Sequence, residues 1–525
     1  MQVLILPRYK QLGFSYGQKG HHRQRAWLQF ADDSVIITPN TESAQALLNL
    51  FQAWCSWSGM TIRLDKCVVF GMKSAGSSYT QSAPFLTLQR GVIPVVPPDG
   101  DFHYLGKYFS FDSKHAKVKK ALKDKLDNLL NITDGLSIRP QSKIKILNQY
   151  IHGQILFELK LYDLSAAWVD IHLDAACTSH IRDWLEMPPS ACVKEATNVR
   201  RREGGLGVDT IQHLHQKMTI LKRYSLKTSK SEEIRTLWAG SGTQCWNAAA
   251  DDAIATSSTP LAASKSLKSA NQKISLEHLT SLSSQGLITR SIIASISSRD
   301  VKTWVQSIEQ MSACIFNFAR KALLQILPTN SLLFLWKRAP SPLCPLCNSS
   351  FSQTNKHVLS NCNSVAALHR YTNRHNDVLI VILEWLRGVI PKTAHLYADL
   401  PDNPYLQVRD LFKNYRPDIA VVTAVNIFVL ELTVCHESNF VKSHEYKCNK
   451  YINLQSDVTT LSDNRTVITN CIEVSTLGLT SDISDFLKLV SIPQMSPATK
   501  FRISKSVIDH SFQIYCNRNN NIIPI

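Results

Sequence analysis

The stretch from Tyr415 to Val434 reads YRPDIAVVTAVNIFVLELTV and decides how we interpret the C-terminal part of the chain. Its apolar runs are typical of two buried strands, which predicts a β-hairpin. Two carboxylates interrupt the apolar residues, Asp418 at the start and Glu431 near the end. An ionised carboxylate that leaves water costs several kcal/mol unless a cation or hydrogen bonds compensate. The stretch therefore predicts a compensating group beside each carboxylate.

The spacing of the two carboxylates follows the pattern P-D-x12-E. In the second strand, Ile427, Val429, Glu431 and Thr433 share one face, because side chains alternate along a strand. A hairpin in this register brings Asp418 and Glu431 together at one edge of the sheet.

The segment that follows the hairpin is SNFVKSHEYKCNKY, residues 438–451. We expect it to form a helix. Lys447, Lys450 and Tyr451 then lie at positions i, i+3 and i+4 on one face. Without the hairpin, the default interpretation of these lysines is an exposed basic face on a basic protein.

A second pattern, CPLCNSSFSQTNKHVLSNC, spans residues 344–362. Cys344, Cys347, His357 and Cys362 have the spacing C-x2-C-x9-H-x4-C. Thiolates and one imidazole in a short segment can close a tetrahedral Zn²⁺ site. His369 is an alternative fourth ligand, although the spacing favours Cys362.

A third pattern, FADDSVIIT, spans residues 30–38 and places Asp32 and Asp33 between two apolar runs. Adjacent carboxylates repel each other, so a turn that presents both is typical of a site for divalent metal. The alternative is that aspartates favour hairpin turns for backbone reasons alone.

The rest of the chain divides by composition. Residues 25–110 have a mixed α/β pattern, including the helical spacing of SAQALLNLFQAWCSW. From 113 to 225 the pattern is helical. The Ser-, Thr- and Ala-rich residues 226–300 predict a linker or a poorly ordered insertion, and helical periodicity then returns.

The first helix of this helical part starts in SKHAKVKKALKDKLDNLL, residues 113–130. One face is lysine-rich, and that face is either a solvated surface or one that follows a phosphate backbone. The opposite face is an apolar stripe, made of Val118, Leu122, Leu126, Leu129 and Leu130.

The overall composition favours a polyanionic partner. The 525 residues carry a formal net charge of +17 and predict three or four domains. Nucleic acid is the first choice of partner and an anionic membrane surface the second. Thirteen scattered cysteines indicate a reducing, intracellular compartment. We expect no signal peptide and no transmembrane segment.

Several motifs in order give the chain a family resemblance. FADD at residues 30–33 is similar to the catalytic box of the reverse transcriptase palm of non-LTR retrotransposons, which implies Asp32 and Asp33 as metal-binding catalytic residues. WSGMTIRLDKC (57–67) resembles the next palm motif and FHYLGKYFSF (102–111) the primer-grip turn. RRREGGLGV (200–208) resembles the glycine-rich turn beyond the thumb.

The hairpin resembles the restriction-like endonuclease of the same retrotransposon class, a relative of P-D-(D/E)-x-K nucleases. The resemblance implies that Asp418 and Glu431 hold Mg²⁺, which would be the compensating cation. Thr433 stands where the plain pattern has its lysine. Lys447 and Lys450 match lysines in a later helix of the family. Lys447 is then expected to orient or deprotonate the attacking water or to neutralise phosphate charge, with Lys450 in support.

The same resemblance implies a Cys-Cys-His-Cys zinc knuckle at the cysteine pattern. Arg374 and His375 match a short Arg-His element, and Glu437 and Glu473 match acidic positions of the nuclease. Glu437 and Glu473 either assist metal binding or simply end a strand, and for none of the four residues does the sequence decide the role.

The palm resemblance is incomplete. A two-metal polymerase needs a further Asp from an upstream strand, and residues 1–31 contain no Asp or Glu. We therefore expect an N-terminally truncated retrotransposon protein that does not polymerise unaided. The segment 1–26 does not match the family.

Together these patterns predict a multidomain α/β and α chain that binds template RNA and target duplex DNA, in the nucleus if functional. Two alternatives are a non-catalytic nucleic-acid-binding remnant and a relic without selected activity. The expected domains are an unmatched segment (1–26), a partial palm (27–112), a helical thumb (113–225), a Ser/Thr-rich linker and helical connector (226–340), a zinc knuckle (341–375) and a restriction-like endonuclease (376–525).

Overall fold

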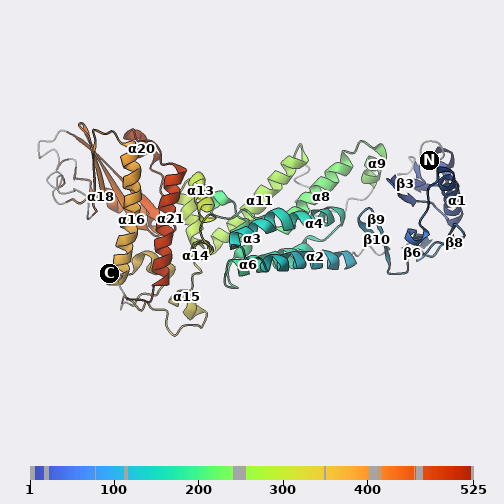
Figure 1. Cartoon of the computed structure of the whole chain (residues 1–525), viewed down its shortest axis with the longest axis horizontal. Helices are drawn as coiled ribbons and strands as arrows, with labels where there is room; N and C mark the ends of the chain where they lie inside the picture. The colour runs from blue at the N-terminus through green and yellow to red at the C-terminus, as the bar shows by residue number, and fades with distance from the viewer. Residues whose placement is uncertain are drawn as a thin grey trace. The chain divides into compact units, whose positions relative to one another are not determined.

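The computed structural model describes residues 6–16, 23–76, 78–111, 116–240, 256–347, 350–400, 412, 415–454, 456 and 465–521. The chain is mixed α/β (Figure 1). It divides into two compact units. The first unit comprises Met1–Leu129, Gly153–Leu173 and Ile211–Leu267, and the second comprises Leu130–His152, Asp174–Thr210 and Lys268–Ile525. None of the helices in these described ranges combines the length and apolarity that a bilayer crossing needs.

The strands of the first unit form small antiparallel hairpins. Within the described ranges there are five separate two-stranded sheets. They are β1 (Phe14–Tyr16) with β2 (Arg23–Arg25), β3 (Trp27–Phe30) with β4 (Asp33–Ile36), β5 (Gly71–Ala75) with β6 (Ser78–Ser82), β7 (Thr87–Leu88) with β8 (Gly91–Val92), and β9 (Asp101–Tyr104) with β10 (Lys107–Ser110).

The acidic hairpin β3–β4 leads directly into helix α1 (Thr41–Ser58). The Asn40 side chain accepts a hydrogen bond from the Ser43 N–H at 2.8 Å, which caps the first turn. The helix ends at Gly59, whose φ of 71° suits glycine. The predicted strands around the acidic turn and the predicted helix after it are both confirmed.

The helical part begins with α2 (Ala116–Asp134), and its predicted apolar stripe is buried at Val118, Leu122, Leu126 and Leu130. Further elements of the first unit are η1 (Leu6–Leu12), η2 (Leu64–Lys66), α4 (His152–Leu161), α5 (Ala166–Val169), η4 (Asp170–Asp174), α8 (Ile211–Lys227) and α9 (Glu232–Gly240). The expectation of a helical pattern from 113 to 225 is therefore confirmed over the described residues.

The Ser/Thr-rich stretch is helical where it is described, so the prediction of a linker or poorly ordered insertion is wrong from residue 260 onward. Helix α11 spans Pro260–Ser281 and is followed by α12 (Leu287–Ser295) and α13 (Ser298–Ile308). Alanine, leucine and lysine favour helices, and no glycine occurs between Pro260 and Gly286. Ala263, Leu267 and Leu279 of α11 are buried, so packing outweighs the serine content. Residues 241–255 lie outside the described ranges.

The second unit contains the glycine-rich turn at 204–207 and a further set of helices. They include α3 (Pro140–Ile146), η3 (Leu147–Ile151), α6 (Ala175–Trp184), α7 (Val193–Asn198), η5 (Arg201–Glu203), α14 (Ala313–Leu323) and α15 (Asn330–Leu335). Arg320 of α14 is fully buried and donates hydrogen bonds to the carbonyls of Gly204 (2.7 Å) and Ala196 (3.0 Å). Gly204 has φ of 90°, a conformation that favours glycine.

The C-terminal part contains a four-stranded sheet in the order β11-β12-β13-β14. Its strands are β11 (His395–Ala398), β12 (Ile419–Val422), β13 (Asn426–Cys435) and β14 (Thr466–Ser475). The first three strands are antiparallel neighbours, whereas β13 and β14 are parallel. The parallel pair requires a crossover, which contains η8 (Glu437–Asn439) and α18 (Phe440–Lys450).

Helices cover both faces of this sheet. On one face, α16 (Val365–Val389), α20 (Ser484–Leu489) and α21 (Pro497–Cys516) pack against Phe428, Leu430 and Leu432 of β13. Figure 1 shows α16 and α21 side by side. On the other face, Ile427 and Val429 pack against Tyr451 and Leu454. The apolar run of β13 does not alternate with polar residues because both of its faces are buried.

Candidate active site

Asp418 and Glu431 meet across the predicted hairpin. The register pairs Ile419 with Leu430, so Asp418 lies opposite Glu431. The Asp418 N–H donates to Glu431 Oε1 at 2.9 Å, and the Leu432 N–H donates to Asp418 Oδ2 at 2.8 Å. Only 9% of Asp418 and 2% of Glu431 are exposed. The sheet therefore holds two buried carboxylates in contact with backbone donors.

Helix α18 brings its lysine face onto these carboxylates. Lys447 Nζ lies 2.6 Å from Glu431 Oε2 and 3.5 Å from Asp418 Oδ2. The Tyr451 hydroxyl donates to Glu431 Oε1 at 2.6 Å. Lys450 Nζ lies 3.9 Å from Glu431 Oε2 and donates to the Tyr451 hydroxyl at 3.0 Å. The compensation that the sequence requires thus comes from an ammonium group, a phenol and backbone N–H groups of the chain itself.

The charges of this cluster stabilise one another. Burial by itself lowers the pKa of Lys447, but the neighbouring Asp418 and Glu431 outweigh burial and raise it above the usual value. Burial by itself raises the pKa of Asp418, but His375 and Lys447 outweigh it and hold this pKa below the usual range. At neutral pH, Lys447 is therefore an ammonium and Asp418 a carboxylate.

His375 of α16 approaches the other oxygen of Asp418. Its Nε2 lies 3.6 Å from Asp418 Oδ1 and 3.3 Å from the Leu432 carbonyl. A carbonyl only accepts, so Nε2 carries a proton. Burial lowers the pKa of His375, but the hydrogen bond and the charge of Asp418 outweigh it and raise the pKa. His375 also lines an open pocket of about 280 Å³, together with Ser360, Tyr371, Thr372, Arg374 and Val434.

The other acidic and basic residues of the nuclease resemblance lie elsewhere. Arg374 is buried and donates to Ser511 Oγ at 3.0 Å, which ties α16 to α21. Glu437 accepts from the Leu477 N–H at 3.2 Å. Glu473 Oε1 lies 2.9 Å from His444 Nδ1. Within the described residues, none of them joins Asp418 and Glu431 in a cluster of three or more metal-ligating side chains.

Thr433 occupies the strand position that holds a lysine in the plain P-D-(D/E)-x-K pattern. It lies opposite Glu473 in the register with β14, and its hydroxyl is 3.8 Å from Cys471 Sγ. The strand has no ammonium group at this position, and Lys447 of α18 places one beside the carboxylates instead. A helix position therefore substitutes for a strand position at the same carboxylates.

Asp32 and Asp33 form a very different pair. Phe30 pairs with Asp33 across the β3–β4 hairpin, and Ala31 has φ of 52° in the two-residue turn. Both aspartates are exposed. In the part of the chain that the structure describes, no further Asp, Glu, His or Cys joins them in a cluster of three. This turn presents its carboxylates to solvent.

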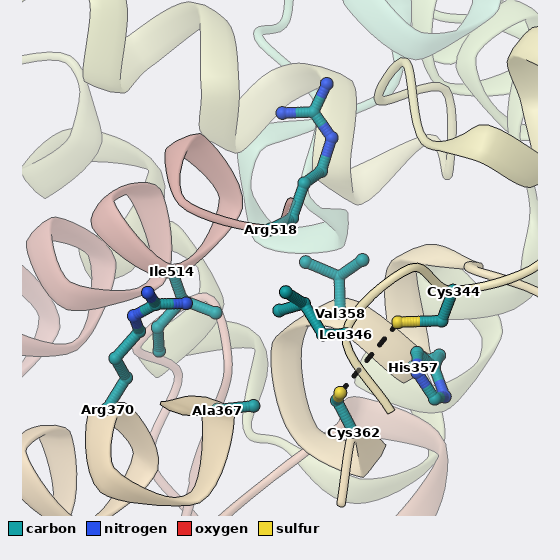
Figure 2. Close-up of a pocket in the computed structure, with 9 residues that line it drawn as sticks. All are labelled: Cys344, Leu346, His357, Val358, Cys362, Ala367, Arg370, Ile514 and Arg518. Atoms are coloured by element: carbon teal, nitrogen blue, oxygen red, sulfur yellow. Dashed lines mark hydrogen bonds between the residues drawn. The ribbon is translucent and has the colours of Figure 1, made fainter. Parts of the chain in front are cut away.

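The four knuckle residues converge on one point. Cys344 Sγ and Cys362 Sγ are 3.9 Å apart, and Cys347 Sγ and His357 Nε2 are 3.5 Å apart. A tetrahedral zinc site with Zn–S of ~2.3 Å and Zn–N of ~2.0 Å has edges of about 3.8 and 3.6 Å. The ligand atoms of all four residues lie within 4.8 Å of one another. Figure 2 shows Cys344, His357 and Cys362 around this point. His369 is not in the cluster.

The surroundings of the knuckle suit a metal centre. Burial lowers the pKa of His357, so the ring is neutral and able to ligate. His357 lies in the π-helical turn η6 (His357–Asn361). The neighbouring Lys356 Nζ donates to Asn439 Oδ1 at 2.9 Å, which joins the knuckle to the segment before α18.

The chain was compared with known proteins. No family model matches the chain. The chain is similar to the retrovirus-related Pol polyprotein from type-1 retrotransposable element R2 of Popillia japonica, with 21% identity over 189 residues. The match covers 35% of this chain and 25% of that polyprotein, so the chain spans about a quarter of its relative. This similarity supports a retrotransposon-related protein.

Three residues of the site were missed or given no role by sequence reasoning. Tyr451 was placed on the lysine face, but its hydroxyl contact with Glu431 was not anticipated. His375 was matched only by its sequence neighbourhood. His444 carried no signal at all, because one histidine in a predicted helix does not reveal that Glu473 lies opposite it.

Proposed function

We propose that this retrotransposon-related chain is a metal-dependent endonuclease that nicks duplex DNA, and that its palm-like segment does not polymerise unaided. The observation that carries the proposal is the convergence of two buried carboxylates and an ammonium group. Perturbed charges gathered in one site, here between the two inner strands of the sheet, are typical of catalytic sites. The similarity to a retrotransposon Pol polyprotein supports this choice over other metal-dependent chemistry.

The proposed partners are polyanions. A formal net charge of +17 favours DNA or RNA, because neutralised phosphates release counterions. A lysine-rich face on α2 adds local positive charge at Lys119 and Lys120. Duplex DNA is the proposed substrate and RNA a proposed second ligand.

Asp418 and Glu431 are the residues that would hold Mg²⁺. Mg²⁺ is usually bound through one or two carboxylates together with waters and substrate oxygens, so this pair fits the ion. When bound, the ion activates water and stabilises the charge that develops on the phosphate. Within this chain, the backbone N–H groups of Asp418 and Leu432 fix the two carboxylates in position.

The protonation state of Lys447 narrows its proposed role. Its raised pKa keeps it an ammonium at neutral pH, which makes it a poor base for the attacking water. The same charge suits neutralisation of the phosphate in the transition state. Lys450 supports the site through Tyr451, and His375 positions Asp418 through its second oxygen.

The cysteine cluster is proposed as a structural zinc knuckle. Cys344, Cys347, His357 and Cys362 would hold the ion with no open position, which is typical of structural sites. The knuckle would stabilise the turn that carries Lys356, and through Asn439 the start of the segment that presents Lys447.

A non-catalytic nucleic-acid binder is the second candidate. One observation favours it: Glu431 already accepts from the Asp418 N–H, Tyr451 and Lys447. A carboxylate that is satisfied by the chain itself can be stable without metal. The two candidates differ in whether wild-type protein cleaves bound DNA.

The decisive experiment is a nicking assay on supercoiled plasmid with Mg²⁺ or Mn²⁺. Wild type, Asp418→Ala and Glu431→Ala are compared at equal DNA occupancy, with Asp377→Asn as a matched control. Asp377 also pairs with a histidine, His510, at 2.6 Å, but its side chain is half exposed. We expect nicking by wild type and the control and loss in both site variants. Binding without nicking by wild type under either metal rejects the nuclease and leaves the binder.

The palm-like segment has its own test. Primer extension on an RNA template with Mg²⁺ or Mn²⁺ should give no product, because Asp32 and Asp33 lack a third carboxylate among the described residues. Extension that Asp32→Ala abolishes would contradict this part of the proposal.

A further inference from the structure

A second cluster of metal-ligating side chains lies outside the nuclease-like site and the knuckle. Cys192 precedes α7, Glu195 lies in its first turn, and His278 belongs to α11. Cys192 Sγ is 2.9 Å from Glu195 Oε2, and His278 Nδ1 is 3.2 Å from Glu195 Oε1. The ligand atoms of all three residues lie within 4.8 Å of one another. Segments more than eighty residues apart in the sequence thus bring together a thiol, a carboxylate and an imidazole.

We propose that Cys192, Glu195 and His278 form a second zinc site, with three protein ligands and one position open to water. Zinc accepts this mixture of sulfur, nitrogen and oxygen ligands. A tetrahedral site has S–O edges of about 3.6 Å and N–O edges of about 3.4 Å, so the observed separations need to widen by less than about 1 Å. The His278 side chain is 56% exposed, which leaves room for water on the solvent side.

Nucleophilic catalysis explains this cluster less well. Glu195 stands between the other two side chains, so the thiol faces a carboxylate and not the imidazole. A cysteine nucleophile needs an adjacent base or cation that favours the thiolate. A bound metal would supply the positive charge that the thiolate lacks here.

The position of the site suggests what the zinc does. His278 lies in the last turn of α11, the helix formed by the Ser-rich stretch. Gln285, just beyond α11, already accepts from the Cys192 N–H at 2.8 Å and donates to the Ser190 carbonyl at 2.8 Å. Zinc at the three ligands would join the same two segments a second time. The proposed role is a staple between the end of α11 and the turn before α7.

Zinc stoichiometry of the full chain tests the proposal. Protein stripped with chelator is dialysed against Zn²⁺, and bound metal is measured by elemental analysis. We expect about two zinc ions for wild type, because the knuckle and the new site each hold one. His278→Gln and Glu195→Gln should each retain about one, as should Cys347→Ser in the knuckle, and His278→Gln combined with Cys347→Ser should retain none.

Control variants separate this site from adventitious binding. His510→Gln removes a histidine that also pairs with a carboxylate but has no cysteine beside it, and it should keep two zinc ions. Hydrogen exchange at the end of α11 should slow on zinc addition in wild type and Cys347→Ser, but not in His278→Gln. His278 is exposed, so this substitution should leave the fold intact. No zinc in wild type, or as much zinc in His278→Gln as in wild type, would overturn the proposal. A single zinc ion that His278→Gln loses and Cys347→Ser keeps would support the new site and reject the knuckle.

Discussion

Two carboxylate pairs in this molecule each lie on a β-hairpin, but they differ in burial and in the groups that contact them. Asp32 and Asp33 lie in the exposed turn of an isolated two-stranded sheet. Asp418 and Glu431 lie across a hairpin inside a four-stranded sheet that has helices on both faces. The first pair is solvated by water, and the second is satisfied by backbone N–H groups, Tyr451 and Lys447.

The difference shows which feature makes a carboxylate pair chemically competent. Adjacent acids in the sequence are easy to recognise, but exposure keeps such groups close to ordinary solution behaviour. Burial makes the cost of charge large, so every neighbour that compensates it also fixes the geometry. Asp418 and Glu431, which twelve residues separate in the sequence, are therefore the pair that the fold holds in a defined geometry.

The largest expected effect comes from removing one member of the buried cluster. Glu431→Ala leaves Lys447 in a partly buried site without its closest counter-charge, and breaking a buried ion pair costs about 3–5 kcal/mol. Local stability of β13, measured by native-state hydrogen exchange, should fall by roughly this amount. Asp33→Ala should change the exchange of β4 by less than about 0.5 kcal/mol, which is usual for surface substitutions.

Equal effects of Glu431→Ala and Asp33→Ala would refute this account of the comparison. Glu431→Gln refines it, because the amide keeps the size of the side chain and can still accept from Tyr451. If charge matters more than shape, Glu431→Gln should lose most of the stability that Glu431→Ala loses.

The second prediction concerns a buried ionisable group that lacks a counter-charge in direct contact. Burial lowers the pKa of His152 to about 4, an effect that the charge of Asp209 only partly offsets. The folded-state pKa lies below the unfolded value near 6.5, so the unfolded chain binds more protons between these values. The contribution of neutral His152 to the stability of the second unit is therefore fully present above pH ~6.5. The free energy of unfolding falls by about 3 kcal/mol as the pH drops toward 4.

His152→Gln should flatten this pH dependence, as measured by urea unfolding or hydrogen exchange at a series of pH values. His395→Gln is the matched control, because His395 is an exposed histidine of β11 in the same unit. It should leave the slope unchanged. A slope that survives in His152→Gln would assign the pH dependence to other groups.

The third prediction concerns the position of the ammonium group beside Asp418 and Glu431. Lys447→Met should reduce nicking by about tenfold to a hundredfold if the proposed nuclease is correct, since removal of one charge-stabilising donor has effects of up to 10²–10³. Thr433→Lys, added to this variant, restores a lysine two residues after Glu431 on the same face of β13. Partial recovery of nicking would show that the strand and helix positions are equivalent.

Thr433→Val combined with Lys447→Met is the control for the rescue, because it fills a similar volume without charge. No recovery with lysine, or equal recovery with valine, would show that Lys447 acts through a geometry that the strand cannot reproduce. Lys450→Met added to Lys447→Met should lower nicking further if Lys450 supports the site.

Local patterns predicted most of this architecture. The hairpin, the lysine face of α18, the stripe of α2 and the convergence of the knuckle cysteines followed from spacing, because each depends on neighbours within about twenty residues. The contacts of His375 with Asp418 and of His444 with Glu473 join segments far apart in sequence, and spacing does not encode those. The helix at 260–281 has the composition of a linker, and only the burial of Ala263, Leu267 and Leu279 shows why it folds.

The smallest expected effect concerns exposed charge. On α2, Lys117 lies 2.8 Å from Asp101 and Lys123 pairs with Asp127, so part of the lysine face is already neutralised within the chain. Such exposed pairs contribute little to stability, and each phosphate contact that is lost should lower the salt slope of nucleic-acid binding by about one unit.

Lys119→Gln, Lys120→Gln and Lys123→Gln together should therefore weaken binding at low salt and reduce the slope by less than about three. Lys488→Gln, which removes an exposed lysine of α20 paired with Asp485 at 3.0 Å, is the control. An unchanged slope in the triple variant would exclude α2 from the binding surface and leave the positive charge of other elements to attract the nucleic acid.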